Sequence, residues 1–195
     1  MTGVRPGRAV SLLVCLAVAG CGGTAPQRKS DPLPPGTRPI GPGPRFHQPI
    51  AAGVKVAGCR PGPLGPRFGV HLELFGEGLV ALFPAGLGTE PPRKVFSGRI
   101  VRARCHGPLV TIDPTGLVLL RPGTEATVGD VFALWGRPLG TRGAAAFGGA
   151  VRAYVNGHRQ PGPPQDIPLR RHDSIVLEVG PYVPPHRRYH FPAGW

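Results

Sequence analysis

Acidic residues are scarce in this sequence: only 10 Asp and Glu occur among 195 residues, against 23 Lys and Arg. This scarcity leaves no convincing pair of carboxylates for general acid–base catalysis. Serines are few beyond the N-terminal region, and Ser30, Ser97 and Ser174 stand in no nucleophile motif. A phosphate-binding P-loop, a dinucleotide glycine fingerprint and a G-x-S-x-G elbow are also missing. We therefore expect that the protein is not an enzyme and carries no cofactor.

Long hydrophobic runs are absent as well, and the main apolar stretch lies near the N-terminus. It covers residues 9–20 (AVSLLVCLAVAG) and follows Arg5 and Arg8. A bilayer-spanning helix needs about 20 apolar residues, so this run is too short for one. Its basic start, apolar middle and small residues at the end are typical of a secretory signal.

The end of that stretch, Val18-Ala19-Gly20-Cys21, resembles the lipobox of bacterial lipoproteins. The resemblance implies a signal peptide at 1–20 and a lipid on the thiol of Cys21. The protein would then be anchored to the cell membrane on its extracytoplasmic side, because two or more acyl chains give stable attachment. The alternative is an ordinary signal peptide in which Cys21 is incidental.

Glycine and proline are abundant, with 31 Gly and 27 Pro. They dominate residues 21–49, where apolar residues are isolated, so we expect a lipidated, disordered tether there. From residue 50 the pattern changes to short apolar runs, and we expect a β-rich domain over 50–180. Residues 181–195 form the expected Pro-rich C-terminal tail.

The apolar runs predict short strands. Residues 70–75 and 79–83 flank a Gly-Glu-Gly turn and predict one hairpin, and residues 109–112 and 117–120 flank Asp-Pro-Thr-Gly and predict another. Residues 100–105 (IVRARC) alternate as an edge or half-exposed strand would, and residues 150–155 and 174–179 predict two further strands. An Asn-Gly pair at 156–157 predicts a hairpin turn.

One helix is predicted at residues 127–135. Thr127 is suited to the N-cap, and Asp130 lies in the first turn, where the helix dipole favours an acid. Val128, Val131, Phe132 and Trp135 fall on one face. The sequence therefore predicts an α+β, β-rich fold, in which a short-stranded sheet packs against one main helix.

The order hairpin, helix, strand pair over residues 109–179 resembles a β-grasp domain, so the C-terminal half is expected to be β-grasp-like. Longer stretches resemble an uncharacterised family of exported bacterial proteins: HLELF (71–75), TIDPTGLV (111–118), GDVFALWGRPL (129–139), YVNG (154–157), IPLRRHDSIVLEVG (167–180) and PPHRRYHFPAG (184–194). That family has no activity to carry over. Its members have more histidines near the first hairpin and before Asp113, whereas Val110 and Ile112 stand at those places here.

Two cysteines, Cys59 and Cys105, remain in the expected domain. In an oxidising compartment this even number predicts a disulfide between them. The alternative is a reactive thiol at Cys105, which is followed by His106.

His71 and Glu73 are two residues apart on a predicted strand, so their side chains leave the same face. Imidazole and carboxylate are acceptable ligands for zinc or copper, and Asp113 is a third candidate. His186 and His190 could complete such a site, although we expect them to be exposed in the tail. The alternative is that His71 is a hydrogen-bonded strand residue.

Positive charge is the remaining feature of the sequence. Removal of residues 1–20, which contain Arg5 and Arg8, lowers the formal charge from +13 to +11. An exported protein of this charge meets anionic lipid headgroups and acidic envelope polymers, and we expect no nucleic-acid partner. The predicted contact patches are Arg99, Arg102 and Arg104 on one strand, and Arg170, Arg171, Arg187 and Arg188. We expect a membrane-anchored binding or structural module, with metal binding or delivery through His71 and Glu73 as the alternative.

Overall fold

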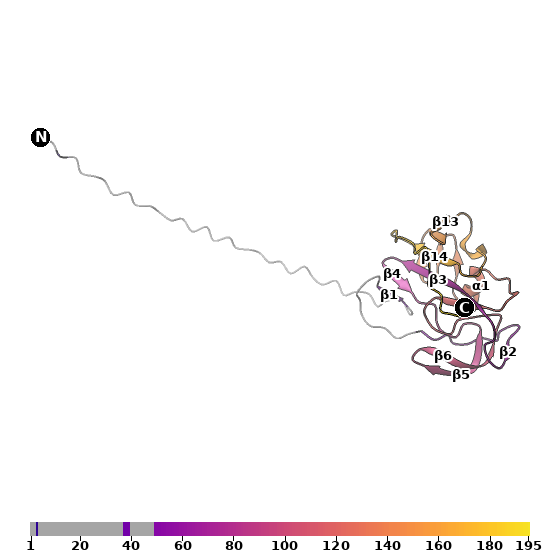
Figure 1. Ribbon diagram of the computed structural model, residues 1–195. Coiled ribbons are helices and arrows are strands. Elements are labelled where there is room, and N and C mark those ends of the chain that lie inside the picture. Colours follow the sequence, from indigo (N-terminus) through magenta and orange to yellow (C-terminus); the bar gives the residue numbers. More distant parts are fainter. Residues whose placement is uncertain (1–2, 4–36, 40–48) are drawn as a thin grey trace. The chain divides into compact units, whose positions relative to one another are not determined.

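The computed structural model describes residue 3, residues 37–39 and residues 49–195 (Figure 1). The chain divides into two units, Met1–Pro32 and Leu33–Trp195. The buried apolar side chains of the second unit lie between Val56 and Val179. This unit therefore has its own core, and we expect residues 33–195 to fold without the first unit.

The main sheet is organised around β3 (Phe68–Gly76). One edge of β3 pairs in parallel with β14 (Ser174–Val179), which pairs antiparallel with β12 (Val151–Val155), and β12 pairs with β13 (His158–Gln160). The other edge pairs with β4 (Leu79–Ala81), which also pairs with β1 (Thr37–Pro39). This core of β4-β3-β14-β12-β13, with its parallel pair in the middle, has the strand order of a β-grasp sheet.

The first hairpin of that sheet is not the one predicted. The resemblance to a β-grasp domain covers residues 109–179, but the parallel partner of β14 comes from residues 68–76. The hairpin of β7 (Leu109–Val110) and β8 (Leu117–Leu120) instead pairs through β8 with the first half of β3. Both hairpins have apolar strands and a good turn, and no local signal distinguishes which of them meets β14.

The helix α1 (Val128–Trp135) follows the prediction closely. Val128, Val131 and Phe132 are buried in the same apolar cluster as Leu72 and Ile175 of the sheet. Thr127 is the N-cap, and its backbone N–H donates to the Asp130 carboxylate at 2.7 Å. The predicted one-sided burial of this helix is confirmed.

A second sheet comes mainly from the connection between β4 and α1. It contains β5 (Thr89–Phe96), β6 (Arg99–His106) and β2 (Arg60–Pro61), in the order β2-β6-β5 (Figure 1). The predicted strand at 100–105 is thus the middle strand and is half exposed. Strand β5 was not predicted, because Pro91 and Pro92 argue against a strand.

Short elements fill the connection between α1 and β12 and the segment before β14. They are β9 (Leu139–Gly140), β10 (Gly143–Ala144), β11 (Phe147–Gly148) and the 3-10 helix η1 (Pro164–Asp166). The Phe147 ring lies against Gly76 of β3, where a Cβ would lie 2.2 Å from the ring. A glycine is therefore required at position 76 for this packing.

The C-terminal residues 181–195 contain no strand or helix, as expected of a Pro-rich tail, but they pack on the domain. Tyr189, Phe191 and Trp195 contact an apolar cluster that includes Ile112 and Leu119. The tail therefore covers part of β8 and the loop before it.

Candidate functional site

The strongest concentration of charge among the described residues lies on the β5–β6 hairpin. Residues 91–104, which we call the basic hairpin, contain five cations and no acid. The cations are Arg93, Lys94, Arg99, Arg102 and Arg104. This segment includes one of the two predicted arginine patches.

The strand register places the outer cations of the basic hairpin together. Lys94 is opposite Arg102, and Phe96 is opposite Arg99. The register shifts between Lys94 and Val95, so Val101 is an extra residue in β6. Because side chains alternate along a strand, this bulge keeps Arg99 and Arg102 on the same face as Lys94.

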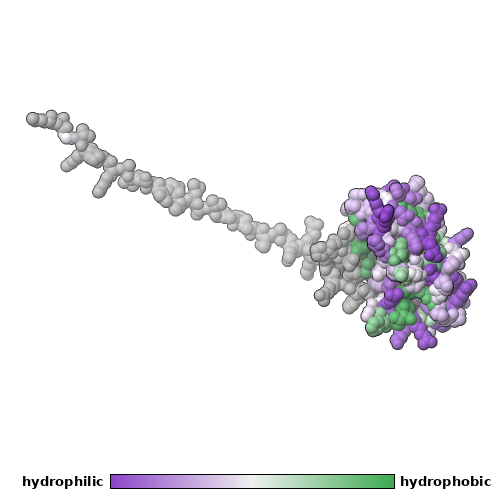
Figure 2. Space-filling view, in the orientation of Figure 1, coloured by the Kyte–Doolittle hydropathy of each residue, from purple (hydrophilic) through white to green (hydrophobic). Residues whose placement is uncertain are grey.

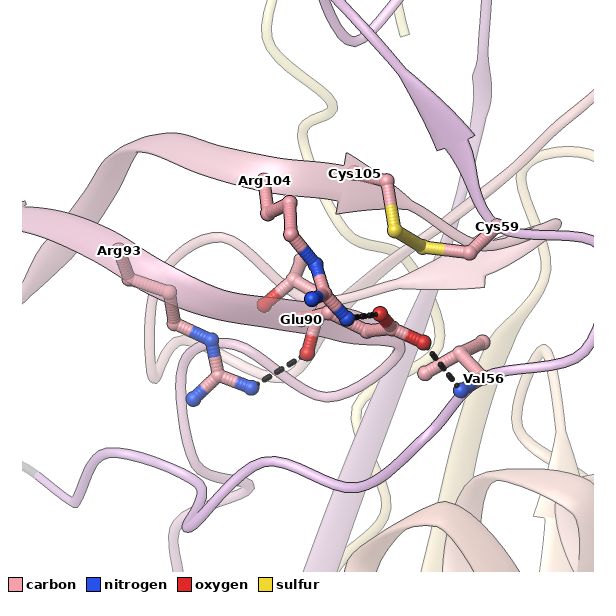
Figure 3. Close-up of polar contacts among 7 residues, drawn as sticks. Val56, Cys59, Glu90, Arg93, Arg104 and Cys105 are labelled. Carbon is pink, nitrogen blue, oxygen red and sulfur yellow. Dashed lines mark hydrogen bonds and ion pairs between the residues drawn. A yellow bond between two sulfur atoms is a disulfide. The ribbon is translucent and has the colours of Figure 1, made fainter.

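Two of the five cations have structural roles. The Arg93 guanidinium donates to the carbonyl oxygens of Ala51 at 2.6 Å and Gly86 at 3.0 Å, which attaches β5 to the neighbouring loops. The Arg104 guanidinium forms an ion pair with Glu90 (Figure 3). These two arginines are therefore engaged within the protein.

Glu90 is the buried acceptor of that arrangement. Its carboxylate also accepts the backbone N–H of Val56 at 2.8 Å, beside the disulfide (Figure 3). The hydrogen bond from Val56, followed by that from Arg104, holds the pKa of Glu90 below its usual range. The carboxylate thus links β5, β6 and the segment before β2.

The remaining three cations have no acidic partner among the described residues. The ion pairs there are Arg104–Glu90, Arg152–Glu178 and His186–Glu73. Lys94, Arg99 and Arg102 are exposed and point their charge toward solvent. They are free to bind an anion.

A groove runs along this part of the molecule. It has a volume of about 980 Å³ and is lined by residues 92–94 and 99–104 of the basic hairpin, residues 62–64, His106, Ile112 and Trp195. Its lining therefore combines cationic side chains with apolar ones. Such a groove suits an anionic group that carries an apolar portion.

The predicted disulfide is present. Cys59 and Cys105 are bonded, with their Cα atoms 5.5 Å apart. Within the part of the chain that the structure describes, Cys59, Glu90 and Cys105 are also the one trio of metal-ligating residue types whose atoms lie within 4.8 Å of one another. Because the two sulfurs are bonded to each other, neither is a thiolate ligand, and Cys105 is not a free nucleophile.

The candidate metal ligands are only partly brought together. Glu73 accepts a hydrogen bond from His186 Nδ1 at 2.8 Å. His71 lies two residues earlier on β3, where its Nε2 contacts the Thr115 carbonyl oxygen at 3.0 Å and its ring stacks on Tyr189. Among the described residues, the ligand atoms of Asp113, His71 and Glu73 do not all lie within 4.8 Å of one another.

The environment of His71 favours its neutral form. The side chain is buried, and its Nδ1 has no hydrogen-bond partner among the described residues. Burial lowers the pKa of His71, although Glu73 opposes this effect. Burial raises the pKa of Tyr189, and the negative charge of Asp113 raises it further.

Two of the four other predicted arginines, Arg171 and Arg187, contact the region of the main sheet. Arg171 lies over the Phe68 ring, 5.3 Å from its centroid, at the start of β3. Arg187 lies against Gly157 in the turn between β12 and β13. Arg170 and Arg188 are exposed. These four residues do not belong to the basic hairpin.

Lys94 and the Glu90 contacts were missed by sequence reasoning. The two prolines concealed β5, and nothing local indicates that Glu90 accepts hydrogen bonds from Val56 and Arg104. The signal that could have found the site is the absence of acids across residues 91–104.

The proposed lipidation site, Cys21, lies outside the described residues, so it stays a prediction. Within the described part of the chain, no helix is long and apolar enough to span a membrane. Comparisons with protein-family models, curated proteins and solved structures found no match.

Proposed function

We propose that this chain is a lipid-anchored, extracytoplasmic binding protein without catalytic activity, and that its basic hairpin binds anionic groups of the cell envelope. The observation that carries this proposal is the set Lys94, Arg99 and Arg102, which share a face and have no acidic partner among the described residues.

The chemistry of these side chains supports binding to phosphate or carboxylate. A guanidinium offers a planar fork of donors that matches either group, and an ammonium adds a point charge. Residues 91–104 contain no acid that would oppose an anionic partner. The attraction would be screened by salt, as expected for exposed charges.

The proposed anchor would make modest affinity sufficient. A lipid on Cys21 would hold the domain near the membrane through the 15 residues from 22 to 36, which precede β1. Tethering by a short linker gives effective concentrations in the millimolar range. Even a weak interaction between the hairpin and an anionic group at the membrane would then be formed most of the time.

The charge claim is tested with residues 33–195 and inorganic polyphosphate as the probe. The variant K94S/R99S/R102S should bind polyphosphate about tenfold or more weakly than the natural sequence. The matched control is R137S/R142S/R159S, which removes three exposed arginines outside both predicted arginine patches and should bind nearly as well. Equal weakening by both variants would show that only net charge matters and would contradict the proposed site.

The anchor is tested separately in cells. Cys21→Ala should give unprocessed protein without lipid, which leaves the detergent phase in a phase-separation assay. A Cys21→Ala protein that still partitions with lipoproteins would refute lipidation at this cysteine.

Metal binding is the second candidate, because Glu73 contacts His186 and the buried His71 Nδ1 has no described partner. Residues 33–195 would then take up one equivalent of Zn²⁺ or Cu²⁺, and Glu73→Gln would remove that binding. A structural zinc site has four ligands and a catalytic site has three, so two contacting side chains favour this function less.

A further inference from the structure

The tip of the basic hairpin exposes apolar side chains beside its cations. Six large hydrophobic residues are exposed among the described residues, and three of them, Val95, Phe96 and Val101, lie here. Phe96 is 71% exposed, Val101 51% and Val95 45%. Figure 2 shows hydrophobic surface at this end of the domain, with hydrophilic side chains next to it.

The backbone holds this tip in a defined shape. Ser97 and Gly98 connect β5 to β6, and both have positive φ, 46° and 76°. Two such residues form the tight turn that matches the twist of a hairpin. Phe96 and Arg99 are paired directly on either side of the turn. An exposed phenyl group is thus fixed next to a guanidinium.

This arrangement is costly for a surface that meets only water. Transfer of the exposed Phe96 side chain out of water lowers the free energy, and Val95 and Val101 add further exposed apolar groups to the same tip. A membrane interface offers both an apolar phase and anionic headgroups, whereas a soluble polyanion offers only charge.

We infer that the hairpin tip inserts Phe96 into the interface of an anionic bilayer, while Lys94, Arg99 and Arg102 contact lipid phosphates. This inference rests on the proposed function, since it uses the same three cations. It goes further by selecting the bilayer over acidic polymers as the partner. The lipid anchor and the hairpin would then be two separate attachments to one membrane.

The length of the preceding chain is compatible with this second attachment. Fifteen residues, 22–36, separate the proposed lipidation site from β1, and a chain of that length spans at most about 50 Å. A chain of that length allows the domain to return its hairpin to the surface that holds the anchor.

The test uses residues 33–195, which lack the lipidation cysteine, and vesicles of phosphatidylcholine with or without phosphatidylglycerol. Phe96→Ser should reduce co-sedimentation with the anionic vesicles about tenfold and leave polyphosphate binding unchanged. Tyr182→Ser is the matched control, because Tyr182 is 64% exposed outside the hairpin, and it should change neither readout. Phe96→Trp should show a blue-shifted emission only when anionic vesicles are added.

The outcomes separate insertion from anion binding. If Phe96→Ser binds anionic vesicles as well as the natural sequence, or if Phe96→Trp shows no blue shift, insertion is overturned while the basic site stands. Loss of polyphosphate binding by Phe96→Ser would also overturn insertion, because the ring would then act in anion binding itself. If K94S/R99S/R102S binds polyphosphate normally, the proposed function fails first. Equal binding to vesicles without phosphatidylglycerol would overturn the anionic bilayer as partner.

Discussion

The main sheet and the β2-β6-β5 sheet are stabilised in different ways. All six residues of β14 are buried, and the sheet packs against α1 through a large apolar cluster. In β5, by contrast, most residues from Pro91 to Phe96 are exposed. That sheet is attached by a disulfide, by the contacts of Glu90 and by the hydrogen bonds of Arg93.

The difference explains where a binding surface can form. A strand that contributes little to an apolar core needs covalent and polar cross-links to stay in place. When such cross-links hold the strand in place, its outward-facing side chains are not needed for stability and are available for binding. Lys94, Arg99 and Arg102 are such side chains, whereas Arg93 and Arg104 provide links.

The largest expected loss of stability comes from a substitution in the apolar core of the main sheet. Phe132→Ala should lower the free energy of unfolding by about 3 to 5 kcal/mol, because it leaves a cavity between α1, Phe83 and the sheet. Ala133→Glu, on the exposed face of α1, should change it by less than about 0.5 kcal/mol. Urea midpoints measure both, and equal effects would contradict one-sided burial.

The next effect concerns the covalent link of the second sheet. The two cysteines are 46 residues apart, so the double variant C59A/C105A should lose about 4 kcal/mol in the chain-entropy description. Unreduced, denatured residues 33–195 should contain no titratable thiol. Two free thiols in that assay would rule out the disulfide.

Acid should weaken each sheet through one buried histidine. Burial lowers the pKa of His71 in β3 from 6.5, and burial followed by the charge of Arg67 lowers that of His106 in β6. The unfolded chain therefore binds protons at a higher pH than the folded one, and stability falls as pH drops below about 6.5. Each group contributes at most about 1.4 kcal/mol per pH unit.

That slope can be assigned by substitution. Urea midpoints measured from pH 7.5 to pH 5 should decline less steeply for His71→Gln and for His106→Gln than for the natural sequence. Variants that keep the full slope would show that neither imidazole is protected from protonation in the folded state.

The smallest effect concerns the start of α1. Asp130→Ala removes the acceptor of the Thr127 N–H and should cost about 1 kcal/mol. Glu125→Ala, an exposed acid before the helix, is the matched control and should cost less than about 0.5 kcal/mol. Indistinguishable thermal midpoints for the two variants would argue against a cap at this position.

The sequence predicted elements whose signals are local. Helix α1 has a cap, an apolar face and a terminating Gly136, and the hairpin of β12 and β13 has its Asn-Gly turn. Pairing between distant segments has no such signal, so the predicted first hairpin of the β-grasp sheet was wrong. Strand β5 was missed because prolines favour loops. In the structure, Pro91 and Pro92 lie at the register shift between Glu90 and Arg93, where the regular pairing of β5 with β6 is interrupted.

The candidate site was predicted in part for the same reason. Alternation along residues 100–105 indicated that Arg102 and Arg104 share an outward face. Only the pairing with β5, with its register shift, places Arg99 on that face, adds Lys94 and assigns Arg104 to Glu90. The contact of His186 with Glu73 joins residues 113 positions apart, and spacing along the chain does not encode it.

Anion binding by the basic hairpin is tested most directly by the change in backbone amide chemical shifts when polyphosphate is added to ¹⁵N-labelled residues 33–195. We expect the largest shifts to fall on residues 93–104 and to return to their starting values as salt is raised to about 0.5 M. Shifts centred instead on Arg170, Arg171, Arg187 and Arg188 would contradict the assignment of the binding surface to the hairpin.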